Sequence, residues 1–135
     1  YQNYIRMYVA DDGTRVVYLH SPESWLTALG LEVDQTTIIS NIATAGTDFT
    51  ISSASFTTYG KVAQLRIVAS SSVAKTGTNS LATLVSGKRP KAYASATVRT
   101  YTNRAAYIHS NGQVQLTGDV TAGNSYDILA TYILA

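Results

Sequence analysis

Residues 60–70 read GKVAQLRIVAS, and apolar side chains recur at every second position within this stretch. This period of two is that of a β-strand, whose successive side chains point to opposite faces of a sheet. One face is uniformly apolar and predicts a stripe that faces the core: Ala63, Leu65, Ile67 and Ala69. The opposite face mixes apolar and polar side chains: Val62, Gln64, Arg66 and Val68. Such a strand suits either a contact between subunits or an inner strand of a sandwich, and the pattern favours neither.

The same alternation recurs along most of the chain after this strand and before it. Further candidate strands are bounded by Gly, Asn, Asp, Ser or Pro: residues 36–40, 49–53, 81–85, 92–99, 105–109, 114–117 and 126–134. The pair Asn111-Gly112 is the strongest hairpin signal, because both residues tolerate a positive φ. Short strands with a turn about every 8–12 residues are typical of a sandwich or barrel. We therefore expect an all-β, antiparallel fold.

The first 33 residues follow a different pattern. Two alternating runs, 4–10 and 15–20, flank the turn residues Asp11–Thr14 and predict a hairpin. Ser21-Pro22-Glu23 then has the residues that begin a helix, and Gly30 can end it. These signals predict one short helix near Pro22–Leu29. We expect residues 1–33 to form a hairpin and helix packed on a main β domain of residues 34–135.

The length and composition of the chain limit the classes of function that it can have. A chain of 135 residues has the length of one domain, and with no cysteine it has neither disulfides nor thiolate sites. Only 13% of the residues are charged and the net charge is +2, which argues against a nucleic-acid partner because phosphate binding needs clustered Lys and Arg. No apolar run approaches the ~20 residues that span a bilayer, so we expect no membrane partner.

Residues that carry catalysis or bind metals are sparse. The two histidines, His20 and His109, stand at strand ends outside any hydrolase motif. Asp11-Asp12 could suggest calcium, but no further acids follow at the spacing of a calcium loop, and a hairpin turn explains the pair equally well. Gly87-Lys88 is followed by Arg89 where a phosphate loop needs Ser or Thr. We therefore expect no enzyme activity, no metal and no cofactor.

Four segments of the last two-thirds of the chain occur in an order and at a spacing similar to those of a known domain. They are residues 60–67 (GKVAQLRI), 81–90 (LATLVSGKRP), 106–114 (AYIHSNGQV) and 126–134 (YDILATYIL). Together they resemble the domain at the C-terminal ends of bacteriophage tail-fibre, baseplate and other receptor-binding proteins. Val85 and Lys88 depart from the proline and aromatic residue usual there, while the turn residues Gly87 and Pro90 are present. The resemblance covers about residues 49–135 and leaves 1–48 unassigned.

The resemblance implies a jelly-roll-like β-sandwich that assembles as a homotrimer and attaches the phage to a saccharide or teichoic-acid-like polymer of the host surface. The trimer interface would then use Val62, Gln64, Arg66 and Val68. The protein would be made in the bacterial cytoplasm and exposed outside the cell on the virion. Because the chain begins at Tyr1, we expect a missing N-terminal part that contacts other virion proteins. Two alternatives are a purely structural trimeric virion domain (a head fibre or baseplate spacer) and a monomeric carbohydrate-binding module.

The expected ligand-binding residues lie between two candidate strands, at Arg99, Tyr101, Asn103 and Arg104. The tyrosine ring could stack on a sugar, the amide could bond hydroxyls and the two guanidinium groups could bind phosphate. The alternative is an ordinary polar hairpin tip, and the loop Lys75–Ser80 is equally exposed on this reading.

Overall fold

The computed structural model describes residues 5–19, 33–101 and 103–135, and the chain divides into two compact units, Tyr1–Glu32 and Val33–Ala135. In the smaller unit, strands β1 (Ile5–Val9) and β2 (Arg15–Leu19) pair antiparallel, which confirms the predicted hairpin. The helix predicted near Pro22–Leu29 lies outside the described residues, as do His20 and Glu23.

The larger unit is one nine-stranded sheet in which every pair of neighbours is antiparallel. Across the sheet the strands follow the order β3-β5-β6-β11-β8-β9-β10-β7-β4. A 3-10 turn, η1 (Ile39–Asn41), precedes β4. The bounds of the strands are β3 (Val33–Thr36), β4 (Ala43–Ala45), β5 (Phe49–Tyr59), β6 (Val62–Ser71), β7 (Asn79–Leu84), β8 (Ala94–Val98), β9 (Ala105–Ile108), β10 (Gln113–Leu116) and β11 (Ser125–Ile133).

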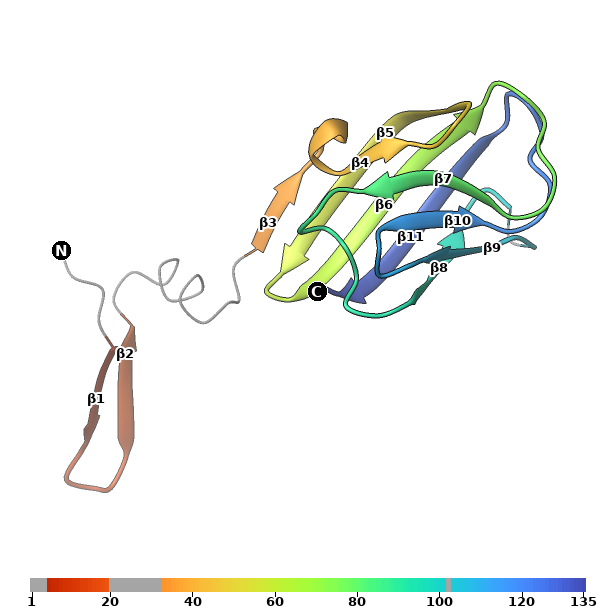
Figure 1. Cartoon of the computed structure of the whole chain (residues 1–135). Helices are drawn as coiled ribbons and strands as arrows, with labels where there is room; N and C mark the ends of the chain where they lie inside the picture. Colours follow the sequence, from red (N-terminus) through yellow and green to blue (C-terminus); the bar gives the residue numbers. More distant parts are fainter. Residues whose placement is uncertain (1–4, 20–32, 102) are drawn as a thin grey trace. The chain divides into compact units, whose positions relative to one another are not determined.

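This sheet curls over so that its two halves enclose one hydrophobic core (Figure 1). Strands β4 and β7, at one end of the strand order, contact β5, which lies near the other end. The prediction of an all-β, antiparallel fold is confirmed. Hydrogen bonding is continuous from β3 to β4, so the two layers expected of a sandwich are here halves of a single sheet.

Strand β6 lies inside the sheet, between β5 and β11. The stripe predicted to face the core is fully buried, with an exposed fraction of 0% at each of Ala63, Leu65, Ile67 and Ala69. On the opposite face Val62 and Gln64 are exposed, while Arg66 and Val68 are half-buried. The alternation read from the sequence therefore assigns both faces of this strand correctly.

Strand β5 continues beyond the predicted strand 49–53 as far as Tyr59, and it contains a β-bulge. The register against β6 shifts between Ile51 and Ser53, and the buried positions change from Phe49 and Ile51 to Ala54 and Phe56. Ser52, the extra residue, donates its hydroxyl to the Val68 carbonyl of β6 at 3.2 Å. A bulge adds one residue to one strand, so a period-two pattern that continues through it changes face.

The hairpin predicted at Asn111-Gly112 joins β9 to β10, as expected. Only Gly112 takes a positive φ, of 95°, while the Asn111 side chain accepts a hydrogen bond from the Gln113 N–H at 3.0 Å. Such three-residue loops place glycine at the left-handed position. Within the residues that the structure describes, no helix is long and apolar enough to cross a membrane.

Candidate functional site

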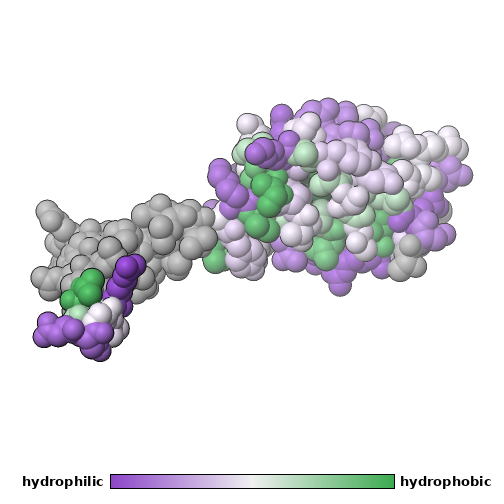
Figure 2. Space-filling view, turned by 90° about the horizontal axis from the view of Figure 1, so that it is seen from below, coloured by the Kyte–Doolittle hydropathy of each residue, from purple (hydrophilic) through white to green (hydrophobic). Residues whose placement is uncertain are grey.

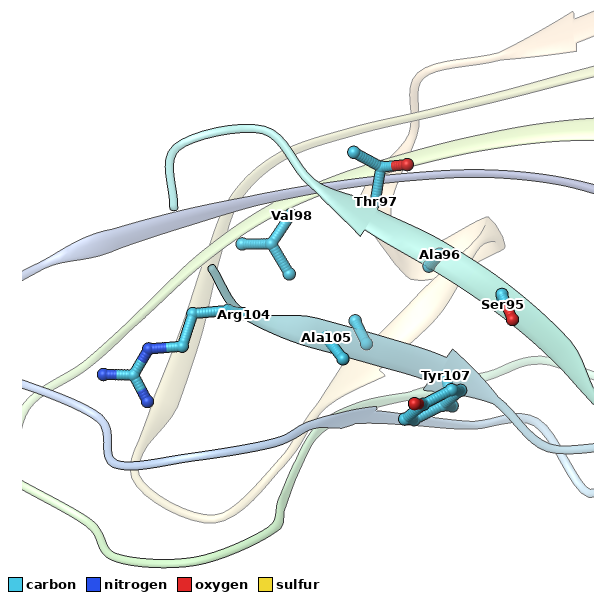
Figure 3. Close-up of a pocket in the computed structure, with 8 residues that line it drawn as sticks. Ser95, Ala96, Thr97, Val98, Arg104, Ala105 and Tyr107 are labelled. Carbon is cyan, nitrogen blue, oxygen red and sulfur yellow. The ribbon is translucent and has the colours of Figure 1, made fainter. Parts of the chain in front are cut away.

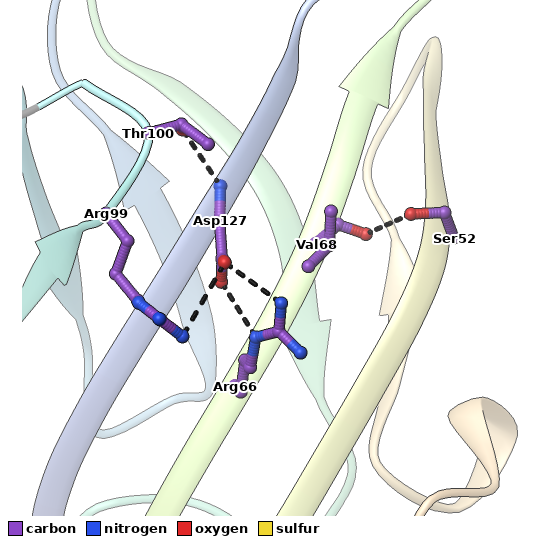
Figure 4. Close-up of polar contacts among 6 residues, drawn as sticks. All are labelled: Ser52, Arg66, Val68, Arg99, Thr100 and Asp127. Carbon is purple, nitrogen blue, oxygen red and sulfur yellow. Dashed lines mark hydrogen bonds and ion pairs between the residues drawn. The ribbon is translucent and has the colours of Figure 1, made fainter.

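The Asp127 carboxylate on β11 brings together two arginines that the sequence places in different candidate sites (Figure 4). Arg66 of β6 donates from Nε and Nη2 to the two carboxylate oxygens, at 3.0 Å each. Arg99 follows β8, and its Nη1 lies 3.8 Å from Asp127 Oδ2. The Asp127 N–H donates to the Thr100 hydroxyl at 3.2 Å. Arg66 is thus held in an ion pair within one chain, while Arg99 adds an unbalanced positive charge and keeps a side chain that is 52% exposed.

The segment from Arg99 to Arg104 does not gather its predicted ligand-binding residues into one site. Tyr101 is half-buried, and its ring centroid lies 5.1 Å from that of Tyr126, a buried core residue. Asn103 is exposed. The Tyr101 ring therefore packs this segment against the core. Of Tyr101 and Asn103, only Asn103 has an exposed side chain that a ligand could reach.

The Arg104 guanidinium lies against the backbone of Gly118. A Cβ added at Gly118, where φ is 84°, would overlap the Arg104 Nη1 atom. The two arginines of the predicted site therefore have different neighbours, Asp127 for Arg99 and Gly118 for Arg104.

A hollow of about 340 Å³ over the paired strands β8 and β9, the β8–β9 hollow, extends from Arg104 to the aromatic residue Tyr107 (Figure 3). Figure 3 shows Arg104 at one end and Tyr107 at the other. Between them the lining is made of small side chains and hydroxyls: Ser95, Ala96, Thr97, Val98, Ala105 and Ala106. Small-molecule sites typically have volumes from about 300 Å³ upward, so the hollow is large enough for a single sugar unit.

Beside this hollow, Tyr93, Tyr107 and His109 form an aromatic cluster. The rings of Tyr93 and Tyr107 are stacked with centroids 5.2 Å apart, and His109 meets Tyr93 edge-on at 5.0 Å. His109 donates from Nε2 to Oε1 of Gln115 at 2.8 Å, and this hydrogen bond fixes the orientation of the imidazole ring. The pKa of the Tyr93 phenol is raised, first because neighbouring groups displace water and second by the electrostatic effect of Tyr107.

The second hollow, of about 800 Å³, opens between β8 and β11 and is called the β8–β11 hollow. Its lining combines the exposed ring of Tyr93 with alanines, hydroxyls and one ammonium group: Lys91, Ala92, Tyr93, Ala94, Ser95, Thr131, Tyr132 and Ile133. Tyr93 lines this hollow and also stacks on Tyr107 of the first one. The aromatic cluster therefore lies between two concave surfaces.

Tyr132, at the base of the β8–β11 hollow, is buried and donates its hydroxyl to the Lys88 carbonyl at 2.6 Å. Burial raises the pKa of this phenol well above its ordinary value. Above about pH 10 the unfolded chain loses the Tyr132 proton while the folded chain keeps it, so the free energy of unfolding falls as pH rises, by up to about 1.4 kcal/mol per pH unit. We expect urea unfolding between about pH 8 and pH 12 to show this fall. The variant Tyr132→Phe should be less stable at neutral pH and fall less steeply; equal slopes in the two proteins would contradict the assignment.

The acidic pair Asp11-Asp12 takes part in the turn of the β1–β2 hairpin. Asp12 Oδ1 accepts a hydrogen bond from the Thr14 N–H at 2.9 Å, and bonds from the Thr14 hydroxyl and then its N–H lower the pKa of Asp12. In the part of the chain that the structure describes, no three His, Cys, Asp or Glu side chains are placed to hold a metal ion together.

Sequence reasoning missed the aromatic cluster, although part of its signal is present. Alternation along 105–109 places Tyr107 and His109 on one face, opposite Ala106 and Ile108, and the structure agrees. Tyr93 reaches the aromatic cluster because β8 pairs with β9 in a register that places Ser95 opposite Tyr107. That register is a long-range property that no local pattern contains.

Comparison with models of known protein families finds no match for this chain, and comparison with curated proteins finds none either.

Proposed function

We propose that this chain is a non-enzymatic binding domain of a bacteriophage tail-fibre or baseplate protein, and that it attaches to a saccharide of the host cell surface. The aromatic cluster is the observation that carries the saccharide-binding part of the proposal, while the phage part rests on the resemblance of the four segments within residues 60–134. Aromatic rings offer apolar faces for the C–H surfaces of a sugar, and Tyr adds a hydroxyl partner at low conformational entropy. The protein would act outside the bacterial cell as part of the virion.

The surroundings of the aromatic cluster suit a neutral or weakly acidic sugar polymer. Ser95, Tyr107 and Gln115 are opposite one another on β8, β9 and β10, so a hydroxyl, a ring and an amide lie in one row across the sheet. Hollows of about 340 and 800 Å³ adjoin the cluster and provide the concavity that small-molecule sites need. Arg104 supplies one positive charge at the far end of the smaller hollow.

Binding to an array of immobilised bacterial surface polysaccharides tests this proposal. We expect the fluorescently labelled chain to bind at least one of them, and Tyr107→Ala to weaken that binding by about tenfold, because a well-packed aromatic contact contributes roughly 0.5–1.5 kcal/mol beyond the area that it buries. Ile38→Ala is the control, since Ile38 is an exposed apolar residue that precedes η1, lies outside the apolar row defined below and lines neither hollow. Absence of binding to any polysaccharide, or equal binding by Tyr107→Ala and the parent, would contradict the proposal.

A second candidate is a purely structural, trimeric virion domain, and a different surface favours it. Val33, Tyr59, Val62 and Ile133 are all exposed and lie opposite one another on β3, β5, β6 and β11. We call these four residues the apolar row. Seen from below, the larger unit shows separate apolar patches among hydrophilic residues (Figure 2). Exposed apolar surface of this kind is typical of interfaces, and a homotrimer would cover it in either candidate function. A monomeric carbohydrate-binding module would leave it open.

A further inference from the structure

The β8–β11 hollow exists because two neighbouring strands separate and then meet again. Val98 and Thr97 pair with Ile128 and Leu129 at one end. At the other end the Lys91 N–H donates to the Ile133 carbonyl at 2.8 Å, and Pro90 bridges Leu134. Between these two contacts the β8 side contributes residues 92–96 and β11 contributes only residues 130–132. The longer segment, 92–96, therefore bends away from β11. The hollow is closed by backbone pairing at both ends.

The backbone of Thr131 faces this hollow. In an antiparallel pair, the N–H and C=O of alternate residues point to the same neighbouring strand. The carbonyls of Asp127 and Ile133 accept hydrogen bonds from Arg99 and Lys91, on the β8 side. Thr131 stands between them in the same alternation, and the described pairs of β11 with β8 end at Leu129. One backbone donor and one backbone acceptor are therefore directed into the hollow.

The lining around Thr131 is mainly apolar and aromatic, and Lys91 and Ser95 add an ammonium group and a hydroxyl. Ala92 and Ala94 contribute small side chains. The Tyr93 ring is 56% exposed although Tyr107 stacks on it and His109 contacts it edge-on. These contacts fix the orientation of the ring, so that it forms a rigid platform beside the polar backbone pair.

We propose that the β8–β11 hollow binds the acetamido group of an N-acetylated amino sugar, an inference that rests on the saccharide-binding function proposed above. The acetamido N–H would donate to the Thr131 carbonyl, and its oxygen would accept from the Thr131 N–H. Its methyl group would contact the alanines, while the sugar ring lies on Tyr93. An extended peptide also has donors and acceptors, but the closed ends of the hollow leave no path for a strand to pass through.

The experiment compares two neutral β-1,4-linked tetramers, one of N-acetylglucosamine and one of glucose, by titration calorimetry on the full chain. They differ only in an acetamido group in place of a hydroxyl. We expect the acetylated tetramer to bind about tenfold tighter or more, because two hydrogen bonds and a methyl contact are gained. In ¹H–¹⁵N spectra the Thr131 amide should shift with the acetylated tetramer.

Two variants make the assignment specific. Tyr93→Ala should lose most of the affinity for the acetylated tetramer, whereas Ile38→Ala should keep it, because Ile38 is similarly exposed at 59% but precedes η1 and lines neither hollow. Equal affinity for the two tetramers, or an unmoved Thr131 amide, would overturn the acetamido inference while leaving saccharide binding intact. Binding of the chain to bacterial polysaccharides without any binding of the acetylated tetramer would overturn it as well. If no saccharide binds at all, both this inference and the proposed function fail.

Discussion

Replacing Gly46 with alanine is expected to lower the free energy of unfolding by about 3 kcal/mol, the upper part of the range for overpacking. Gly46 follows β4, and its N–H donates to the Leu81 carbonyl at 2.9 Å. A Cβ at this position would overlap the Ser80 carbonyl oxygen and lie 3.1 Å from the Ser80 carbonyl carbon. Both atoms belong to the backbone of β7, so they cannot rotate away as a side chain would. The β4–β7 pairing must shift to accept the methyl group.

Gly77→Ala is the matched control for this prediction. Gly77 has a φ of 71° and no atom within 4 Å of an added Cβ. Alanine there should lower the free energy of unfolding only by the strain of the left-handed backbone conformation, on the order of 1 kcal/mol. Urea unfolding of the two variants and the parent measures the difference. If Gly46→Ala is no less stable than Gly77→Ala, the close approach of β4 to β7 is not as described.

The parent chain is expected to sediment and scatter light with about three times the mass of its 14.5 kDa chain, and Val62→Lys is expected to convert it to a monomer. Val62 is central in the apolar row, with Tyr59 on one neighbouring strand and Ile133 on the other. A lysine there would place an ammonium group within an interface, and an unpaired buried charge costs several kcal/mol.

Val73→Lys controls for the added charge alone. Val73 is 44% exposed against 39% for Val62, and it lies in the segment that follows β6 rather than in the apolar row. Light scattering at micromolar concentration should find Val73→Lys as large as the parent. A monomeric parent, or a Val62→Lys variant that keeps the mass of the parent, would contradict the assignment of this interface.

The sequence predicts those parts of the fold that depend on local pattern. Alternation gives the buried face of β6, and Gly112 marks the β9–β10 hairpin. The same alternation does not predict the full length of β5, because the additional residue at the Ser52 bulge exchanges the two faces of the strand. The part of β5 after the bulge is rich in Ser and Thr and therefore resembles a loop in sequence. Short-range signals therefore fail where the strand itself is irregular.

The candidate site depends on contacts that are distant in the sequence and could not be predicted from it. Arg66 and Asp127 are 61 positions apart, so nothing near either residue indicates their ion pair. Tyr93 precedes β8, and its contact with Tyr107 follows from the register of β8 with β9. The hollow beside Tyr93 arises because two paired strands contribute unequal lengths of chain between their contacts. Each of these is a property of strand pairing, not of residue type.

The position of β11 between β6 and β8 delays completion of the sheet until the end of the chain has been synthesised. Translation adds about 5–20 residues per second, so the 61 positions from Arg66 to Asp127 take the ribosome roughly 3 to 12 seconds. Throughout that interval β6 has β5 on one side and an open backbone edge on the other. An open edge can pair with any neighbouring strand, including the same strand of a nascent chain on an adjacent ribosome. The native sheet is completed only when β11 emerges and inserts between strands that have already been made.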